Sequence, residues 1–221
     1  MDENGKIDTR TAKGQATRDR LLAEALRLFA IKGFEAVGTR ELAAAAGTNI
    51  ASIAFHFGGK EGLYGEVVRH VAATLASLYQ NAFAAAQAES RAKGEEPIRR
   101  AHRVIAKLIA ALAASNRSRW MSLLLQREFI TPTACFDTLY EEAIRPCLEE
   151  FSQLVEATAG LAAESLDNRV LAYSLFTMAS AFSRNGNFLR FTGKTGYAPQ
   201  DIDAIGRAVA GFIDKGLRPS A

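Results

Sequence analysis

The chain has 221 residues, of which 48% are hydrophobic and 23% charged, enough for a sizeable buried core in one or two domains. Its formal net charge of +3 is too small to indicate a nucleic-acid partner by itself. No apolar run approaches the roughly 18 residues that a membrane span needs, and no apolar segment follows the N-terminal charges. We therefore expect a cytoplasmic protein with no secretory signal and no membrane partner.

Cysteine and histidine are scarce in this chain. Cys135 and Cys147 are too few for a disulfide framework, so a reducing compartment is the simple interpretation. His56, His70 and His102 lie far apart and show no spacing typical of a metal site. We expect neither a metal ion nor a cofactor.

Helical periodicity dominates the chain and predicts an all-α fold of about nine helices. Residues 1–15 are expected to form a flexible N-terminal arm. Between positions 10 and 20, four basic residues face one acidic residue, which fits either a DNA-binding arm or a solvated tail. The first helix has apolar residues at helical spacing from Leu21 to Phe29 and is expected to end at Gly33.

Two short helices are expected between Gly33 and position 60. Thr39 should cap the first of them, which is rich in alanine and closes at Gly47. The second ends at two adjacent glycines, Gly58 and Gly59. A longer helix should then run from position 60 to about position 88.

Longer helices are predicted for the rest of the chain. Residues 89–97 are the clearest linker. Further along the chain, Pro146 should kink the helix in which it lies. The expected helices are, in order, about 98–114, a segment containing "RWMSLLLQREF", one beginning at Thr131–Pro132, one capped by Ser165 and ending at Phe188, and about 200–215.

The segment "TNIASIAFHFGGKEGLY", residues 48–64, has the composition of the second half of a helix-turn-helix module. The second helix of such a module must bury one stripe against the preceding helices and leave another free to enter a DNA major groove. At about 100° per residue, Ile50, Ile53 and Phe57 share a narrow arc, and we expect all three to be core. Lys60 follows the glycines at a helix N-terminus, where free N–H groups and the ammonium favour a phosphate.

The polar residues of the same short helix form a second arc. Asn49, Ser52 and His56 lie on it, and we expect them to reach base edges or phosphates. Phe55 and Thr48 lie off both arcs, on the side expected to meet the DNA backbone or a thymine methyl group. Alone, this pattern also fits an ordinary solvated helix face, but the two-helix context and the Gly-Gly-Lys exit favour DNA contact.

The stretch "TRELAAAAGTNIASIAFHFGGKEGLY" resembles the DNA-binding domain of the TetR family of bacterial transcriptional regulators. It has the family's Thr at the second helix, Ala-x-x-x-Gly turn, aromatic-His-Phe triplet and Gly-Lys exit, although Ala54 and Gly59 stand where tyrosine and Ser or Asn are common. The resemblance implies a DNA-binding domain over residues 16–62 and an effector-binding and dimerisation domain over residues 63–221. The candidate DNA-contacting residues are Thr39, Arg40, Thr48, Asn49, Ser52, Phe55, His56 and Lys60.

The C-terminal part is similar to the CecR-type branch of that family, over segments such as "LLLQREFITPTACFDTLYEEAIRPCLEEF". From the family resemblance we expect a ligand-responsive regulator, most simply a repressor, that binds near-palindromic double-stranded operator DNA as a homodimer. The similarity to this branch also implies drugs or other toxic compounds as effectors and efflux genes as targets.

An effector site in a helical bundle needs an apolar cavity with few polar groups. The later aromatic and methionine residues fit such a cavity or a plain bundle core, and helical spacing alone favours core. Polar residues among them are better indicators, although Arg127 and Glu128 also fit a structural ion pair at a helix end. The candidate effector-binding residues are Trp120, Leu124, Arg127, Glu128, Phe136, Tyr140, Met178, Phe182 and Asn185.

The last two long helices carry more apolar surface than one face of a bundle needs. A two-fold interface between identical subunits is a natural use of such surface. The candidate interface residues are Tyr173, Phe176, Ile205, Val209 and Phe212.

Two other functions compete with a ligand-responsive regulator. A sequence-tolerant architectural DNA-binding protein would use the same helix-turn-helix module without an effector, but the modest charge and the long remainder of the chain disfavour it. An enzyme built on a helical bundle is disfavoured because the sequence shows no nucleophile–base pair, no paired carboxylates at a persuasive spacing and no phosphate-cradling glycine loop.

Overall fold

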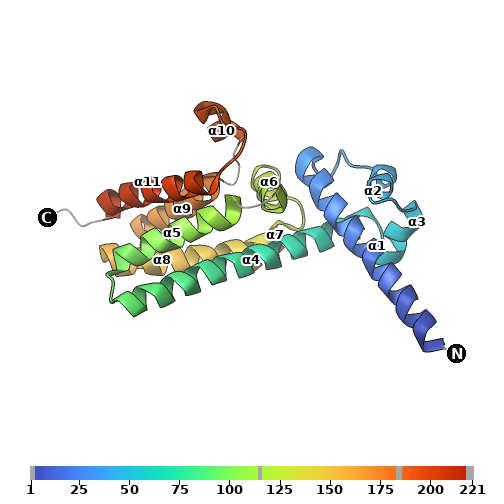
Figure 1. Ribbon diagram of the computed structural model, residues 1–221, viewed down its shortest axis with the longest axis horizontal. Helices are drawn as coiled ribbons and strands as arrows, with labels where there is room; N and C mark the ends of the chain where they lie inside the picture. The colour runs from blue at the N-terminus through green and yellow to red at the C-terminus, as the bar shows by residue number, and fades with distance from the viewer. Residues whose placement is uncertain (1–2, 114–115, 183–185, 218–221) are drawn as a thin grey trace. The chain divides into compact units, whose positions relative to one another are not determined.

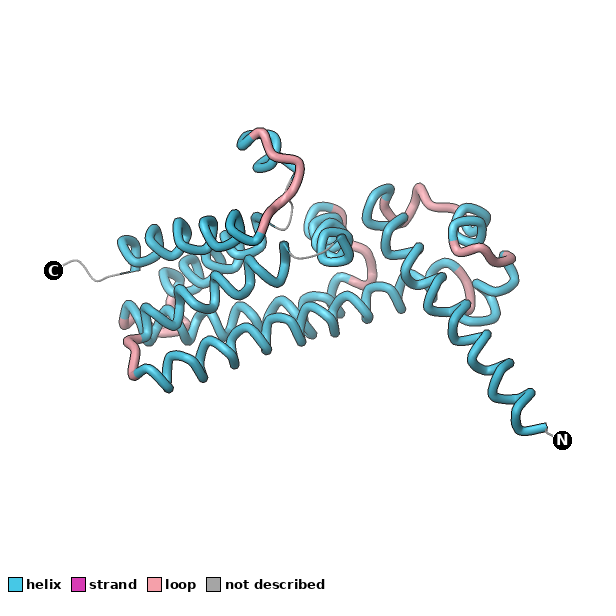
Figure 2. Tube along the Cα trace, in the orientation of Figure 1, coloured by secondary structure: helices cyan, strands magenta, loops and turns pink. Residues whose placement is uncertain are grey.

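The computed structural model describes residues 3–113, 116–182 and 186–217, which form helices joined by short loops (Figure 2). These residues contain no strand, which confirms the all-α prediction. Within the same ranges, no helix is long and apolar enough to cross a membrane. The chain divides into two compact units: the first contains Met1–Val71 and Leu123–Phe136, and the second contains Ala72–Ser122 and Asp137–Ala221.

The first unit has an apolar core to which five helices contribute. Its elements are α1 (Glu3–Lys32), α2 (Thr39–Ala45), α3 (Ile50–Phe57), the start of α4 (Lys60–Lys93) and the end of α6 (Asn116–Ile130) (Figure 1). The largest fully buried side chains of α1 to α4 in this unit are Leu21, Phe29, Leu42, Ile53 and Leu63. The backbone is helical from Glu3 onward, so residues 3–15 of the predicted flexible arm (1–15) are instead part of α1.

Glycines end two helices of the first unit, as the sequence predicted. Gly33 follows α1 with a φ of 86°, and Gly58 follows α3 with a φ of 74°. Such positive φ values carry little steric cost only for glycine. The start of α2 differs from the prediction: Gly38, in an extended conformation, is the N-cap residue, and Thr39 is already helical. The prediction of Thr39 as the cap is therefore wrong.

The second unit is a bundle in which α5 is the central helix. Besides the rest of α4 and the start of α6, its elements are α5 (Pro97–Ala113), α7 (Phe136–Leu139), the π-helical turn η1 (Tyr140–Ile144), α8 (Arg145–Ala159), α9 (Leu166–Ala181), α10 (Gly186–Thr192) and α11 (Pro199–Leu217). α5 packs against α8, α9 and α11 (Figure 1). α11 comes close because Gly206 has no side chain; a Cβ there would lie 3.3 Å from the Ala106 Cβ.

The connection between α4 and α5 is shorter than the sequence predicted. α4 continues to Lys93 and α5 begins at Pro97, so the linker expected over residues 89–97 is only a three-residue turn, 94–96. Pro97 occupies the first position of its helix, where the missing N–H of proline costs no hydrogen bond.

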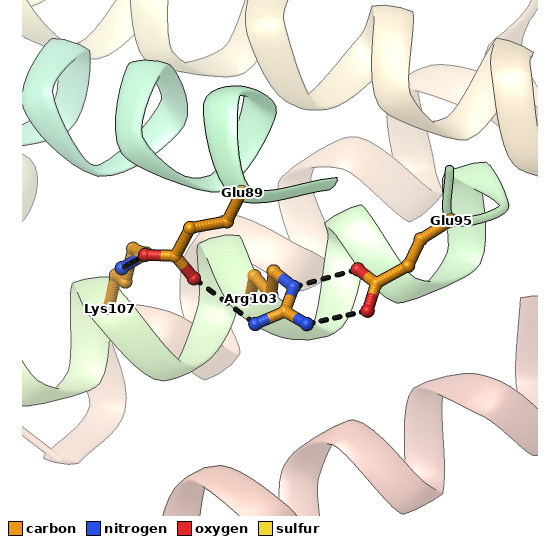
Figure 3. A network of polar contacts seen from close by, with 4 residues as sticks. All are labelled: Glu89, Glu95, Arg103 and Lys107. Carbon is orange, nitrogen blue, oxygen red and sulfur yellow. Dashed lines mark hydrogen bonds and ion pairs between the residues drawn. The ribbon is translucent and has the colours of Figure 1, made fainter. Parts of the chain in front are cut away.

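Figure 3 shows the polar contacts that hold this turn. Arg103 donates to both carboxylate oxygens of Glu95, at 2.6 and 2.8 Å, and to Glu89 at 3.1 Å. Lys107 donates to the other oxygen of Glu89 at 2.6 Å, and this bond lowers the pKa of the Glu89 carboxyl. Because solvent-accessible ion pairs contribute little free energy, we assign this network to the geometry of the turn rather than to overall stability.

The region after α6 is not one long helix. α6 continues to Ile130 and a loop over residues 131–135 precedes α7, so the prediction of a helix beginning at Thr131–Pro132 is wrong. Pro146 lies in the first turn of α8, directly after η1. Proline cannot donate a backbone hydrogen bond, and the irregularity expected at Pro146 takes the form of this π-helical turn.

Ser165 caps α9, as predicted, by accepting a hydrogen bond from the Asn168 N–H at 3.2 Å. The buried Asn168 amide then donates to the Ser152 carbonyl at 3.0 Å and fixes this end of α9 on α8. α9 ends at Ala181 and α10 follows as a separate short helix, so the helix predicted to reach Phe188 is shorter than expected.

Candidate DNA-binding interface

α2 and α3 pack on each other and on α1, which is the arrangement of a helix-turn-helix module. Leu42 of α2 is completely buried, and Ile53 of α3 is nearly so. The turn between the helices passes through Gly47, and the Thr48 N–H donates to the Ala43 carbonyl at 2.9 Å. α3 is therefore anchored along one side.

Polar side chains fix the start of α3. Asn49 is the N-cap residue, and its Oδ1 accepts hydrogen bonds from the Ser52 N–H and the Ser52 hydroxyl, both at 2.9 Å. The Ser52 hydroxyl also lies 2.8 Å from the Thr48 hydroxyl. An N-cap of this kind satisfies an N–H group that the helix terminus leaves without an internal partner. These three predicted DNA-contacting residues thus hold one another.

The apolar arc predicted as core is only partly buried. Ile53 is buried and Phe57 is half-buried, but Ile50 is 45% exposed, so its assignment to the core is wrong. On the polar arc, Asn49 is exposed and His56 is half-buried. α3 rests on Ile53, with Ile50 on one flank and the polar arc on the other.

The side of α3 opposite Ile53 is apolar. At about 100° per residue, Ala51 and Phe55 both lie about 160° from Ile53 around the helix. Phe55 is 84% exposed, and Ala51 and Ala54 are also exposed. The sequence prediction placed Phe55 beside the polar arc that was expected to contact the bases, whereas the structure places Phe55 on the most outward part of α3. The sequence contains a signal for this surface, because apolar residues at positions 50, 51, 54 and 55 have the spacing that puts them on one side of a helix.

Lys60 begins α4, as predicted. Its ammonium lies 4.3 Å from the centroid of the Phe34 ring and 3.5 Å from the Glu35 carbonyl oxygen. These contacts hold a cation at a helix N-terminus, where backbone N–H groups also favour an anion. At the start of α2, Thr39 is half-buried and Arg40 is exposed.

A charged cluster that the sequence did not reveal links three helices behind α3. Arg18 donates to Glu66 at 2.7 Å, and its guanidinium carbon lies 5.3 Å from the centroid of the Phe57 ring. Arg69 donates to the same carboxylate at 2.5 Å. The hydrogen bonds from Arg69 and Arg18 hold the pKa of Glu66 below its usual value. Arg18 therefore braces α1, α3 and α4.

Arg127, predicted as an effector contact, is used within the first unit. Its Nε donates to the Ala30 carbonyl at 2.7 Å, and its terminal N–H donates to the Ile31 carbonyl. Both carbonyls belong to the last turn of α1, where a helix leaves carbonyl groups unpaired and favours a cation. Arg127 thus caps the C-terminus of α1, and these contacts favour a structural role.

Glu128 is also used within the first unit. It is 1% exposed and accepts hydrogen bonds from the Tyr64 hydroxyl, from the Thr133 N–H at 2.9 Å and from the Thr133 hydroxyl. Burial and the bond to Glu128 together raise the pKa of Tyr64 well above its usual value. Glu128 thereby ties α4 to the loop after α6. Arg127 and Glu128 bond to these other groups and not to each other, so the alternative of an ion pair between them is wrong.

The remaining effector candidates do not form one cluster within a unit. Leu124 and Phe136 belong to the first unit, and Asn185 lies outside the described residues. Those in the second unit are Trp120, Tyr140, Met178 and Phe182.

Two hollows of about 610 Å³ each occur in the second unit. One lies on α8 and α9, and Tyr140 and Tyr173 are among its lining residues. The other lies on α5 and α11 and is lined by charged side chains such as Arg99, Arg207 and Asp203. Neither hollow is the enclosed apolar cavity that the sequence analysis expected around Trp120, Met178 and Phe182.

The predicted dimer residues divide into buried and exposed ones. Phe176 is 3% exposed and lies 6.2 Å from the Tyr79 ring, and Ile205 is also buried, so neither faces a partner. Their inclusion in the interface is wrong, because α9 and α11 bury these side chains inside their own unit. Tyr173 and Phe212 are exposed, and Val209 is half-buried.

The fold and this surface define a helix-turn-helix DNA-binding protein with a helical second unit, the architecture of a one-component transcriptional regulator. Residues 21–67 match the family model for bacterial regulatory proteins of the tetR family. Residues 97–217 match the C-terminal domain of the HTH-type transcriptional dual regulator CecR. The chain belongs to the TetR family of bacterial transcriptional regulators and carries a CecR-type C-terminal domain.

Individual relatives agree with this assignment. The chain is 31% identical over 212 residues to the HTH-type transcriptional dual regulator CecR of Shigella flexneri, covering 92% of each chain. A tetR-family regulatory protein from Rhodococcus RHA1 has the same fold, with a TM-score of 0.69, 18% identity and coverage of 93% of this chain and 98% of that one. AibR, solved in complex with isovaleryl coenzyme A and operator DNA, has a TM-score of 0.61 at 15% identity, covering 89% and 97%.

Proposed function

We propose that this protein is a cytoplasmic, ligand-responsive regulator that binds a near-palindromic operator as a dimer and leaves it when a small effector binds. The observation that carries the proposal is the outward side of α3, where Phe55 is 84% exposed on a helix that Ile53 anchors and Asn49 caps. The exposed Ile50, Ala51 and Ala54 continue this apolar surface beside the Phe55 ring, and a contiguous exposed apolar surface is typical of a binding site. Lys60 at the start of α4 adds a contact for a phosphate.

For the dimer, we propose an interface formed by α8 and α9 in place of α9 and α11. Leu166, Val170 and Tyr173 are exposed and recur at helical spacing on one face of α9. The adjoining hollow on α8 and α9 includes Arg145 and Glu149, so both signs of charge border the apolar stripe. A surface of this composition suits a second copy of itself across a two-fold axis.

The dimer sets the distance between two α3 helices. To read one face of B-form DNA, the two must lie about 34 Å apart or a multiple of that distance. An effector then acts only through its different affinity for the DNA-binding and released states. We expect repression as the basal activity, although the Shigella flexneri relative is named a dual regulator.

The effector is expected to be a small apolar or amphipathic compound bound in the second unit, with Trp120, Tyr140, Met178 and Phe182 as the remaining candidate contacts. The AibR structure, which holds isovaleryl coenzyme A and operator DNA, supports the pairing of one ligand with one operator on this fold. Control of efflux or drug-response genes rests on the resemblance to the CecR-type branch.

The test is selection of duplexes from a randomised pool with the full chain, followed by titration at one fixed salt concentration. A regulator should prefer a selected near-palindrome over a scrambled duplex by about 10³-fold or more. Equal affinity for all duplexes would instead support a sequence-tolerant architectural DNA-binding protein. A compound that raises the thermal stability of the chain and releases the selected duplex would identify the effector class.

A further inference from the structure

We propose that α3 reads its operator mainly through the 5-methyl groups of thymine, and that Phe55 and Ile50 are the residues that read them. The inference rests on the operator binding proposed above. It names the chemical feature of the DNA that the outward side of α3 recognises.

The first argument is the composition of the outward side of α3. At about 100° per residue, Ile50, Ala54, Ala51 and Phe55 follow one another around the helix within an arc of about 140°. All four are exposed. The two large apolar side chains stand at the edges of the arc and the two alanines lie between them. Alanine allows the helix backbone to approach base edges closely, so this surface is a shallow apolar trough with two raised sides.

The second argument is that three polar groups beside this trough, the Asn49 amide oxygen and the Ser52 and Thr48 hydroxyls, are already engaged with one another. An asparagine side chain reads adenine through a pair of hydrogen bonds that needs both its amide oxygen and its amide nitrogen. Here the Asn49 oxygen accepts from the Ser52 N–H and hydroxyl, and the Ser52 hydroxyl also contacts Thr48. Reading adenine with Asn49 would therefore break the cap of α3.

The third argument is the chemistry of the major groove. Among the four bases only thymine presents an apolar group there, its C5 methyl. A polar base edge covered by Phe55 or Ile50 would lose water without gaining a hydrogen bond, which is unfavourable. A thymine methyl in the same place buries apolar surface instead. The trough therefore favours thymine at the positions that its two raised sides cover.

The experiment starts from the operator selected with the full chain. Each thymine is replaced in turn by deoxyuracil, which lacks only the 5-methyl group and keeps every hydrogen-bonding group of thymine. We expect one or two thymines in each half-site to matter, with about fourfold weaker binding for each methyl removed. Replacing the same thymine in both half-sites should weaken binding about sixteenfold.

Protein variants assign the contacts to residues. Phe55→Ala should weaken binding and should bind the thymine and uracil forms equally at the position that Phe55 covers. Phe55→Leu, which keeps an apolar contact, should retain part of the preference, and Ile50→Ala should remove it at a different position. Phe191→Ala is the matched control, because Phe191 is 87% exposed on α10 and outside the first unit, and it should keep every preference. Circular dichroism should show unchanged folding for all four variants.

The outcomes separate the inference from the proposed function. If a selected operator binds tightly but replacing each thymine by uracil leaves the affinity unchanged, the inference that α3 reads thymine methyl groups is wrong. The proposed function as an operator-binding regulator would still stand. If both Phe55→Ala and Ile50→Ala keep the full thymine preference, other residues read the methyl groups and the inference is overturned. If no duplex is enriched at all, the proposed function itself fails.

Discussion

Each unit of the molecule exposes an apolar helix face, and the two faces differ in shape and surroundings. On α3 the face is short, with alanines between Ile50 and Phe55. On α9 it is a stripe of large side chains, Leu166, Val170 and Tyr173, with a hollow beside it. The α3 face is on a short helix that the cap and the buried residues hold in place, whereas the α9 face is on a long helix in a bundle.

The difference indicates two kinds of partner. A short trough with small residues at its centre fits a groove whose floor carries isolated methyl groups, and Lys60 at the next helix suits the phosphates beside that groove. A longer stripe of large side chains, bordered by Arg145 and Glu149, fits a surface that carries the same stripe and the same two charges, namely a second copy of this chain. Exposed apolar area alone would not distinguish these partners.

The largest effect is expected from breaking the α9 face. Tyr173→Asp should give a monomer, because a carboxylate would be buried opposite its own copy in the dimer. Operator affinity should then fall about 100-fold or more, because two linked reading helices gain about 10² to 10⁴ over one. Sedimentation velocity and operator titration measure the two effects.

Phe212→Asp is the matched control for Tyr173→Asp. Phe212 is 68% exposed on α11, and we expect its replacement to leave the dimer intact. A dimer that survives Tyr173→Asp but dissociates with Phe212→Asp would return the interface to α11 and remove the contrast between the α3 and α9 faces.

The buried hydrogen bond between α4 and α6 in the first unit, which also carries α3, should show the next largest effect. Glu128→Leu leaves the buried hydroxyl of Tyr64 without its acceptor, so we expect the free energy of unfolding to fall by about 2 to 3 kcal/mol. Adding Tyr64→Phe should restore part of that loss, because both polar partners are then removed. Urea denaturation of the two single variants and the double variant measures the coupling; additive losses would show that the two groups act independently.

A smaller effect is expected at the phosphate-facing edge of the α3 face. Lys60→Ala should weaken operator binding by about tenfold and reduce the slope of log affinity against log salt by about one. His56→Ala should weaken binding without that change in slope. Lys215→Ala, which removes an exposed lysine of α11, should change neither quantity. Unchanged affinity in both His56→Ala and Lys60→Ala would remove this end of α3 and α4 from the interface.

The sequence predicted those features that depend on short local signals. Gly33 and Gly58 end their helices because only glycine adopts the required φ cheaply, and Ser165 caps α9 through a hydrogen bond three residues along the chain. The Gly-Gly-Lys sequence likewise predicted that α4 begins at Lys60. Each of these signals lies within a few residues of the feature that it specifies.

The sequence did not predict which side of a helix meets which neighbour. Helical periodicity placed Ile50 and Ile53 on one arc, but only the packing of α3 on α1 and α2 makes Ile53 the anchor and leaves Ile50 exposed. The partner of Arg127 lies 97 positions away, at the end of α1. Phe176 and Tyr173 are three residues apart on α9, yet one is buried and the other exposed, because α9 is covered on one side only.

The last and smallest effect tests which side of α3 reads the bases. Asn49→Ala removes the N-cap and should lower the free energy of unfolding by about 1 kcal/mol. Asn49→Ser keeps a good cap but has no amide, so thermal stability should be retained and operator affinity should stay within about twofold. Both quantities can be measured by thermal unfolding and by titration with the selected operator and its single-base variants. If Asn49→Ser instead weakened binding about tenfold and changed the preferred base at one position, Asn49 would read that base directly. The polar side of α3 that carries Asn49 would then contact the bases, and the apolar trough of α3 would have no role in DNA recognition. The proposed contrast between a DNA-binding face on α3 and a dimer face on α9 would then fail.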